Sequence, residues 1–175
     1  MSDSSKNIVE FTLIYNRHKA ILFNYTLKMV SDRMVCEDIV QNVFIKFFEN
    51  LEKIRNAEGI RSWLFTTARN EIFTFYRKKK IHVDQFGVAD ADELDLEDLN
   101  NVEDEYEMKE TNELILNSIA ALPCEQKEAF LLKEYGGFSY KEIAAIMNIN
   151  EELVKSRLFK IRKKLILKLS KIYNY

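Results

Sequence analysis

The chain has 175 residues, of which 47% are hydrophobic and 12% aromatic, with only four glycines, one proline and a net charge of −2. This composition provides enough apolar material for a packed core, and the helical periodicity found along most of the chain predicts an all-α fold. Two cysteines (Cys36, Cys124) and two histidines (His18, His82) are too few and too scattered for a metal site; with no signal peptide or long apolar run, we expect a cytoplasmic protein without cofactors or membrane insertion.

The net charge hides a strong segregation of charge along the chain. Residues 1–80 carry 14 basic and 9 acidic residues, a net of +5, and residues 115–175 carry 11 and 6, again +5. Between them, residues 81–114 carry 1 basic and 13 acidic residues, a net of −12. Two basic blocks separated by an acidic one predict two modules that face nucleic acid, joined by a connector.

Residues 6–30 form the first predicted helix. Their apolar side chains recur at helical spacing, which is typical of a helix with one face in a core. We expect His18 to be part of the surface of this helix. The apolar positions are Phe11, Ile14, Tyr15, Leu22, Tyr25 and Met29.

Residues 34–51 (MVCEDIVQNVFIKFFENL) form a second predicted helix, which is apolar beyond a single stripe. Ile45 lies in the middle of its polar side and Phe48 at the border of that side. Such a helix is either buried all round or docks a partner. Because Asp38 and Gln41 flank Ile45, we favour a partner-binding surface. The broad apolar side comprises Val35, Ile39, Val40, Val43, Phe44, Phe47 and Leu51.

A loop containing Lys53 and Arg55 leads to a third predicted helix, residues 60–80 (IRSWLFTTARNEIFTFYRKKK). One face is apolar; the other places Trp63 among amide, hydroxyl and guanidinium groups. This combination suits unstacked bases, because aromatic rings stack on them while cations follow the backbone. The alternative is that Trp63 packs against a neighbouring helix. The core face comprises Leu64, Phe65, Ala68, Ile72, Phe75 and Tyr76, and the opposite face comprises Trp63, Thr66, Thr67, Asn70, Phe73, Thr74 and Arg77.

Residues 81–105 are acidic, weakly apolar and without periodicity, so we expect a flexible linker. Two helices are predicted after it, at residues 107–121 and 125–135. Pro123 separates them, and Gly136 and Gly137 end the second.

Residues 138–164 (FSYKEIAAIMNINEELVKSRLFKIRKK) predict a helix, a short turn and a second helix. Ser139 and Glu142 have the spacing of a capping box at the start of the first helix. Asn148 suits a turn because asparagine tolerates the left-handed conformation. Glu151 and Glu152 then occupy the first turn of the second helix, where negative charge suits the helix dipole.

The second of these helices has one apolar and one polar face. The polar face suits the major groove of DNA, where some side chains reach base edges and flanking cations hold phosphates. An ordinary helical hairpin with a solvated lysine face is the alternative. The buried stripe comprises Val154, Leu158, Ile161, Leu165, Leu169 and Ile172; the outer face comprises Lys155, Ser156, Phe159, Lys160 and Lys163; and a basic row comprises Arg157, Lys160, Lys164, Lys168 and Lys171.

Three motifs together resemble the extracytoplasmic-function sigma factors of the major bacterial sigma family. CEDIVQNVFIKFFENL resembles the helix that binds the core polymerase, and RSWLFTTARNEIFTFYRKKK resembles the promoter-melting helix. LPCEQKEAFLLKEYGGFSYKEIAAIMNINEELVKSRLFKIRKKL resembles the C-terminal promoter-binding domain. The resemblance implies two helical domains, sigma region 2 at residues 6–80 and region 4 at 106–175, joined by the acidic linker 81–105.

The resemblance also implies a role for individual residues. The polymerase clamp helices would contact Asp38, Gln41, Ile45 and Phe48. The melted downstream promoter element would contact Arg55, Arg61, Trp63, Thr66, Asn70 and Arg77. The upstream element, as duplex, would contact Ser139, Tyr140, Lys155, Ser156, Arg157, Phe159 and Lys160.

Further partners follow from the same resemblance. Region 4 would contact the flap of the polymerase, the linker would thread the enzyme near the RNA exit path, and an anti-sigma factor would hold the activity off. No small-molecule substrate and no catalytic activity are implied. The sequence departs from the family at Cys36, Phe48, Thr74 and Asn148, and Thr74, where the family commonly has Asp or Asn, leaves the specificity for the downstream element open.

Two other functions remain at this point. A stand-alone helix-turn-helix regulator would explain residues 138–164 but would leave residues 34–51 and 60–80 without a role. A helical adaptor whose basic faces are only solvated surface would make two separate basic modules a coincidence.

Overall fold

The structure is a computed structural model that describes residues 3–54, 56–86 and 115–173. These residues form helices with short connections and contain no strand, which confirms the predicted all-α fold. They belong to two compact units that divide between Leu94 and Asp95. Most of the predicted linker (87–105) and residues 106–114 lie outside the described part of the chain. Within that part, no helix is long and apolar enough to cross a membrane.

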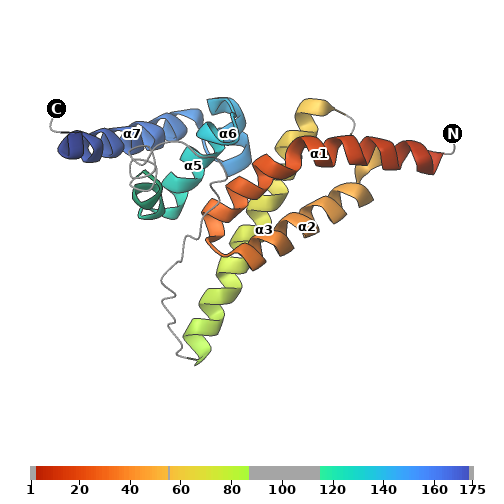
Figure 1. Cartoon of the computed structure of the whole chain (residues 1–175), viewed down its shortest axis with the longest axis horizontal. Coiled ribbons are helices and arrows are strands. Elements are labelled where there is room, and N and C mark those ends of the chain that lie inside the picture. Colours follow the sequence, from red (N-terminus) through yellow and green to blue (C-terminus); the bar gives the residue numbers. More distant parts are fainter. Residues whose placement is uncertain (1–2, 55, 87–114, 174–175) are drawn as a thin grey trace. The chain divides into compact units, whose positions relative to one another are not determined.

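In its described residues, the N-terminal unit has three α-helices that all pack against one another: α1 (Asp3–Val30), α2 (Arg33–Glu49) and α3 (Ala57–Phe86). Figure 1 shows α1 and α2 side by side with α3 crossing both, while the C-terminal part of α3 extends beyond them. A two-residue turn joins α1 to α2: Ser31 adopts a left-handed conformation (φ 57°), and the Asp32 side chain caps α2 by accepting from the Val35 amide at 3.0 Å. This cap holds the start of α2 in place.

The core of this unit is made of apolar side chains that were predicted to face it. An aromatic cluster lies between α1 and α2. The rings of Tyr15 and Phe44 are 4.7 Å apart, and that of Phe11 lies 5.2 Å from Phe48 and 6.3 Å from Phe47. The first two pairs are edge-to-face and the third is stacked, and aromatic pairs of both kinds add to the free energy of burial. The fully buried side chains include Leu22, Tyr25, Met29, Cys36, Val43, Phe47, Leu64, Phe65, Ala68 and Ile72.

Two details of the N-terminal unit differ from the predictions. His18 is buried rather than at the helix surface, and burial, together with the charges of Arg17 and Arg61, lowers its pKa.

The third helix begins at Ala57 and ends at Phe86, so it is longer at both ends than the predicted 60–80 and includes the first residues of the predicted linker. A short 3₁₀ turn, Leu51–Lys53, precedes it, with Leu51 buried.

The C-terminal unit contains a helical segment at 115–120, followed by α5 (Cys124–Glu134), α6 (Tyr140–Met147) and α7 (Glu151–Tyr173). α5, α6 and α7 pack against one another. Their shared core includes Leu131, Leu132, Phe138, Ile143, Val154, Leu158 and Ile161, all almost completely buried. Val154, Leu158 and Ile161 therefore confirm the first part of the predicted stripe on α7; the side chains of Leu169 and Ile172 lie outside the described part.

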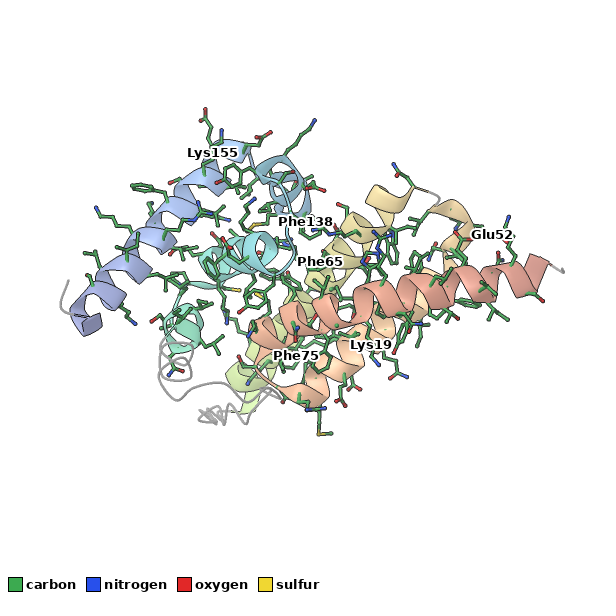
Figure 2. All side chains as sticks on the ribbon, turned by 45° about the horizontal axis from the view of Figure 1, so that its top comes forward. Lys19, Glu52, Phe65, Phe75, Phe138 and Lys155 are labelled. Atoms are coloured by element: carbon green, nitrogen blue, oxygen red, sulfur yellow. The ribbon has the colours of Figure 1, made fainter. Side chains whose placement is uncertain are left out.

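The turn between α5 and α6 depends on its two glycines. Gly137 has a positive φ of 64°, a conformation that is costly for other residues. A Cβ at Gly136 would lie 2.6 Å from the Leu132 carbonyl oxygen and from the Phe138 ring. The close turn buries Phe138, which is labelled in Figure 2. This fixes α6 against α5 and so positions the helix-turn-helix.

Candidate functional sites

The outer surface of α2 carries the four residues predicted to bind the polymerase: Asp38, Gln41, Ile45 and Phe48. All four are exposed, and Ile45 and Phe48 keep 49% and 47% of their surface accessible, although the opposite side of α2 is buried. The helix is therefore not buried all round. It presents two large apolar groups that follow an acid and an amide along the same side of the helix, and we call these four residues the α2 surface.

Met34 extends this surface by one turn and was not identified from the sequence. It lies four residues before Asp38, on the same side of the helix, and 78% of its surface is exposed. Methionine is flexible and polarisable, which suits a protein-binding surface. The i, i+4, i+7, i+11 spacing of Met34, Asp38, Gln41 and Ile45 was the available signal.

The predicted downstream-element residues lie along one side of α3. Asn70 and Arg77 are exposed, and Thr66 is partly exposed. Trp63 is partly buried, and its ring lies 5.9 Å from that of Phe47 on α2. The indole thus packs against a neighbouring helix, as in the second possibility, although the residue is not fully buried; stacking on an unpaired base stays a prediction. We call Trp63, Thr66, Asn70 and Arg77 the α3 surface.

The two arginines predicted to accompany this surface have different outcomes. Arg61 is partly exposed at the start of α3 and lies close enough to His18 to lower the pKa of that imidazole. Arg55 lies outside the described residues. Lys78, Lys79 and Lys80 are exposed at the next turns after Arg77, so the basic character continues along the helix.

The predicted helix-turn-helix is present in the C-terminal unit with its expected caps. The Ser139 hydroxyl accepts from the Glu142 amide at 3.2 Å, and the Glu142 carboxylate accepts from the Ser139 amide at 2.7 Å, which completes the capping box. Asn148 ends α6 in the left-handed conformation (φ 54°, ψ 49°). Asn150, which the sequence did not single out, caps α7 by accepting from the Leu153 amide at 2.8 Å.

The outer face of α7 carries Lys155, Ser156, Phe159 and Lys160, and all four are exposed. Phe159 keeps 68% of its surface accessible, so an aromatic ring is available beside the two lysines. Lys155, labelled in Figure 2, stands near the start of α7. We call these four residues the α7 surface.

Arg157, also predicted to bind the upstream element, is less exposed than the four residues of the α7 surface. Its guanidinium group forms an ion pair with Glu125 of α5, and only 15% of its side chain is exposed. The contact joins two helices of the C-terminal unit. The ion pair therefore helps to hold α7 against α5, and a contact of Arg157 with the upstream element stays a prediction.

Arg162 is a further residue that the sequence analysis missed. It donates to the Tyr140 hydroxyl at 3.5 Å and to Glu134 at 3.4 Å, and so ties α7 to α5 and α6. The hydrogen bond from Arg162 and the nearby charges of Lys133 and Lys155 lower the pKa of the Tyr140 phenol. Tyr140, at the N-terminus of α6, is thus within reach of the charge of Lys155 on α7, in a locally positive environment that suits a phosphate.

Comparison with protein families matches both units of the chain. Residues 14–81 match the family Sigma-70 region 2, and residues 112–165 match Sigma-70, region 4. The chain is 30% identical over 151 residues to the ECF RNA polymerase sigma factor SigL of Mycobacterium tuberculosis, covering 83% of this chain and 80% of that protein. It is 29% identical over 152 residues to the ECF RNA polymerase sigma factor SigM of Bacillus subtilis, covering 87% and 90%.

Two solved structures share the fold. The sigma factor RpoE of Bartonella quintana, crystallised with the anti-sigma factor NepR, matches with a TM-score of 0.69 and 25% identity, over 97% of this chain and 98% of that one. CnrH, solved with the cytosolic domain of CnrY, matches with a TM-score of 0.62 and 18% identity, over 92% and 88%. The second likeness concerns the fold alone.

Proposed function

The chain belongs to the ECF RNA polymerase sigma factors, and we propose that it binds core RNA polymerase and directs promoter recognition, melting and transcription initiation. The observation that carries this function is the presence of both sigma regions in one chain, each on its own helical unit. A stand-alone helix-turn-helix regulator would use only α6 and α7. As a sigma factor the protein would act in the cytoplasm and catalyse no reaction itself, because the chemistry belongs to the polymerase.

The α2 surface is our candidate for the polymerase contact. Ile45 and Phe48 are exposed apolar groups on a helix whose other side is buried, and such groups become the core of a protein interface when a partner covers them. Asp38 and Gln41 would supply the polar contacts around them. The clamp helices of the polymerase would be the partner of this surface, and the flap would contact the C-terminal unit.

The α3 surface, with Arg61, is our candidate for the melted downstream element. A partly accessible indole, an amide, a hydroxyl and a guanidinium in one row can stack on an unpaired base, bind its edge and hold its phosphate. The α7 surface, with Ser139 and Tyr140, is the candidate for the upstream duplex element. It combines exposed lysines with one exposed aromatic ring on the second helix of a helix-turn-helix.

Regulation by an anti-sigma factor is also part of the proposal. It is supported by the likeness to RpoE of Bartonella quintana, which was solved with the anti-sigma factor NepR. An anti-sigma factor that covers the α2 or α7 surface would prevent polymerase or promoter binding. Co-purification from the native cell would identify this partner.

Transcription in vitro tests the proposed function. Core polymerase from a bacterium would be incubated with and without the protein on fragmented genomic DNA, and the new 5′ ends would be sequenced. We expect transcripts from a small set of promoters that share two sequence elements. Absence of any promoter-specific stimulation would contradict the function.

A further inference from the structure

The N-terminal unit has a further exposed apolar face, on the side of α1 that does not contact α2. Leu13 keeps 67% of its surface accessible and Ile21 keeps 41%, and Ile14 is partly exposed. At 3.6 residues per turn these three side chains share one side of the helix. Phe11 and Tyr15, whose rings contact Phe44 of α2, lie on another side. The apolar face is therefore separate from the contact between α1 and α2.

Two opposite charges flank the centre of this apolar face. Glu10 lies three residues before Leu13, and Arg17 lies three residues after Ile14; both charged side chains are exposed. Within the described residues, no ion pair engages either of them. Their seven-residue separation corresponds to two turns, about 10.5 Å along the helix axis. We call Glu10, Leu13, Ile14, Arg17 and Ile21 the α1 face.

The order of these groups makes the α1 face complementary to itself. If two copies of α1 pack antiparallel about a two-fold axis between Leu13 and Ile14, Glu10 of each copy lies opposite Arg17 of the other. The two apolar pairs then cover one another, and their burial provides affinity. A parallel arrangement would instead bring like charges together. The charges therefore specify one orientation of a second copy.

The α1 face also differs from the surfaces that we assign to polymerase and DNA. It carries one acid and one base around its centre, whereas the lysines of the α7 surface make that surface basic. A face without net charge has no electrostatic attraction for phosphates. The α2 surface lies on a different helix. A second copy of this chain is thus the partner whose charges match the α1 face.

We propose that two copies of this chain associate through the α1 face, with their α1 helices antiparallel. One side of one helix offers a small contact area, so the association belongs to the weak class, with a dissociation constant in the micromolar range or above. The contact requires neither polymerase nor DNA. The inference therefore goes beyond the proposed function and does not rest on it.

Sedimentation velocity of the purified full chain, from micromolar to millimolar concentration, tests the proposal. A reducing agent would be present, because Cys124 is exposed and would otherwise allow a disulfide between copies. We expect reversible conversion of monomer to dimer as the concentration rises. Leu13→Glu places a charge at the centre of the contact and should weaken the association by roughly 30-fold or more. Ile8→Glu is the matched control, since Ile8 is 54% exposed on a different side of α1, and it should associate like wild type.

Reversal of the two charges tests the antiparallel arrangement. Glu10→Arg makes both ends of the α1 face positive, and Arg17→Glu makes both ends negative. Each variant alone should therefore associate roughly 10-fold more weakly than wild type, since two ion pairs become two repulsions. An equimolar mixture of the two variants restores both pairs of opposite charges and should form dimers again. The double variant Glu10→Arg/Arg17→Glu should also associate like wild type.

Three results would overturn the inference. The first is a wild-type protein that stays monomeric at millimolar concentration, and the second is a dimer that Leu13→Glu leaves intact. The third is a mixture of Glu10→Arg and Arg17→Glu that associates no better than either variant alone, although circular dichroism shows both to be folded. Promoter-specific transcription is a separate measurement, so each of these results leaves the proposed function standing.

Discussion

The α2 and α7 surfaces place exposed apolar groups in opposite electrostatic settings. On α2, Ile45 and Phe48 lie beside Asp38 and Gln41, with no basic residue in the set. On α7, the more exposed Phe159 lies between Lys155 and Lys160. The first combination suits a protein partner, where burial of apolar area provides the affinity. The second suits DNA, where phosphate contacts make the affinity dependent on salt.

The two surfaces also differ in the contacts that hold their helices in place. The α2 surface lies on the back of a helix whose other side is anchored by the aromatic cluster of Phe11, Tyr15, Phe44 and Phe47. The α7 surface lies on a helix that is anchored by the aliphatic side chains of Val154, Leu158 and Ile161, while Asn150 fixes the helix start and Arg157 joins it to α5 by an ion pair. Substitutions should therefore have different consequences in the two units.

The largest effect is expected for Ile45→Glu. The change places a charge in the centre of the proposed polymerase interface, where loss of one central contact typically costs 2 kcal/mol or more, so affinity for core polymerase should fall by roughly 30-fold or more. The fold should persist because Ile45 is exposed. Leu13→Glu is the matched control, since Leu13 is an exposed apolar residue of α1 in the same unit. If Ile45→Glu unfolds the unit in circular dichroism, or binds polymerase like the control, the assignment of α2 is wrong.

A sequence-dependent loss is expected for Lys160→Ala. If Lys160 contacts a base edge, affinity should fall by roughly 5- to 150-fold on the best upstream element and less on variants of it. Lys164→Ala, on the flank of the same helix, should weaken binding by a similar factor on every sequence. Fluorescence anisotropy on a panel of upstream-element duplexes with holoenzyme measures both. Identical profiles for the two variants would contradict the division between base and phosphate contacts.

A loss of stability rather than of DNA contacts is expected for Arg157→Ala. Removing the ion pair with Glu125 should cost about 1 kcal/mol, and for a unit of this size that lowers the melting temperature by roughly 4–8 °C. Lys155→Ala removes a cation from an exposed position of the same helix and should leave the melting temperature unchanged while weakening DNA binding. Thermal unfolding followed by circular dichroism distinguishes them. Equal melting temperatures for wild type and Arg157→Ala would show that the ion pair does not stabilise the unit, and would favour a DNA contact as the role of Arg157.

The smallest effect is expected from titration of His18. Because the pKa of His18 is lowered in the folded state, the unfolded chain binds the proton more readily at mildly acidic pH. This contribution to stability is present above the ordinary histidine pKa and is lost as the pH falls below it. The melting temperature should therefore fall between pH 7.5 and pH 5.5 by more in wild type than in His18→Gln. The same decrease in both proteins would show that His18 does not contribute.

Local patterns predicted those features that depend on neighbouring residues in the chain. The Ser139–Glu142 capping box, the left-handed Asn148 and the exposure of Ile45 each follow from the identity and spacing of residues within a few turns. The same holds for the buried stripe of α7 as far as Ile161. In each case helix geometry alone relates the sequence to the structure.

Contacts between distant residues were not accessible in this way. Periodicity placed Arg157 on a basic row but could not reveal Glu125, 32 positions earlier, as its partner. Periodicity could not show whether Trp63 faces solvent or a neighbouring helix. In the structure its ring packs against the Phe47 ring of α2, and the residue remains partly exposed. His18 was expected at the surface, because nothing near it in the sequence shows that the fold buries it close to Arg61.

Promoter-dependent transcription with three proteins tests the central claim most directly. Core polymerase would be supplied with wild type, Ile45→Glu or Lys160→Ala on a promoter found by the genomic experiment, and full-length transcripts would be counted. We predict abundant transcripts with wild type and almost none with Ile45→Glu at equal protein concentration. With Lys160→Ala, a defect should be relieved by some changes in the upstream element. Full activity of Ile45→Glu, together with a loss for Lys160→Ala that no promoter change alters, would contradict the account.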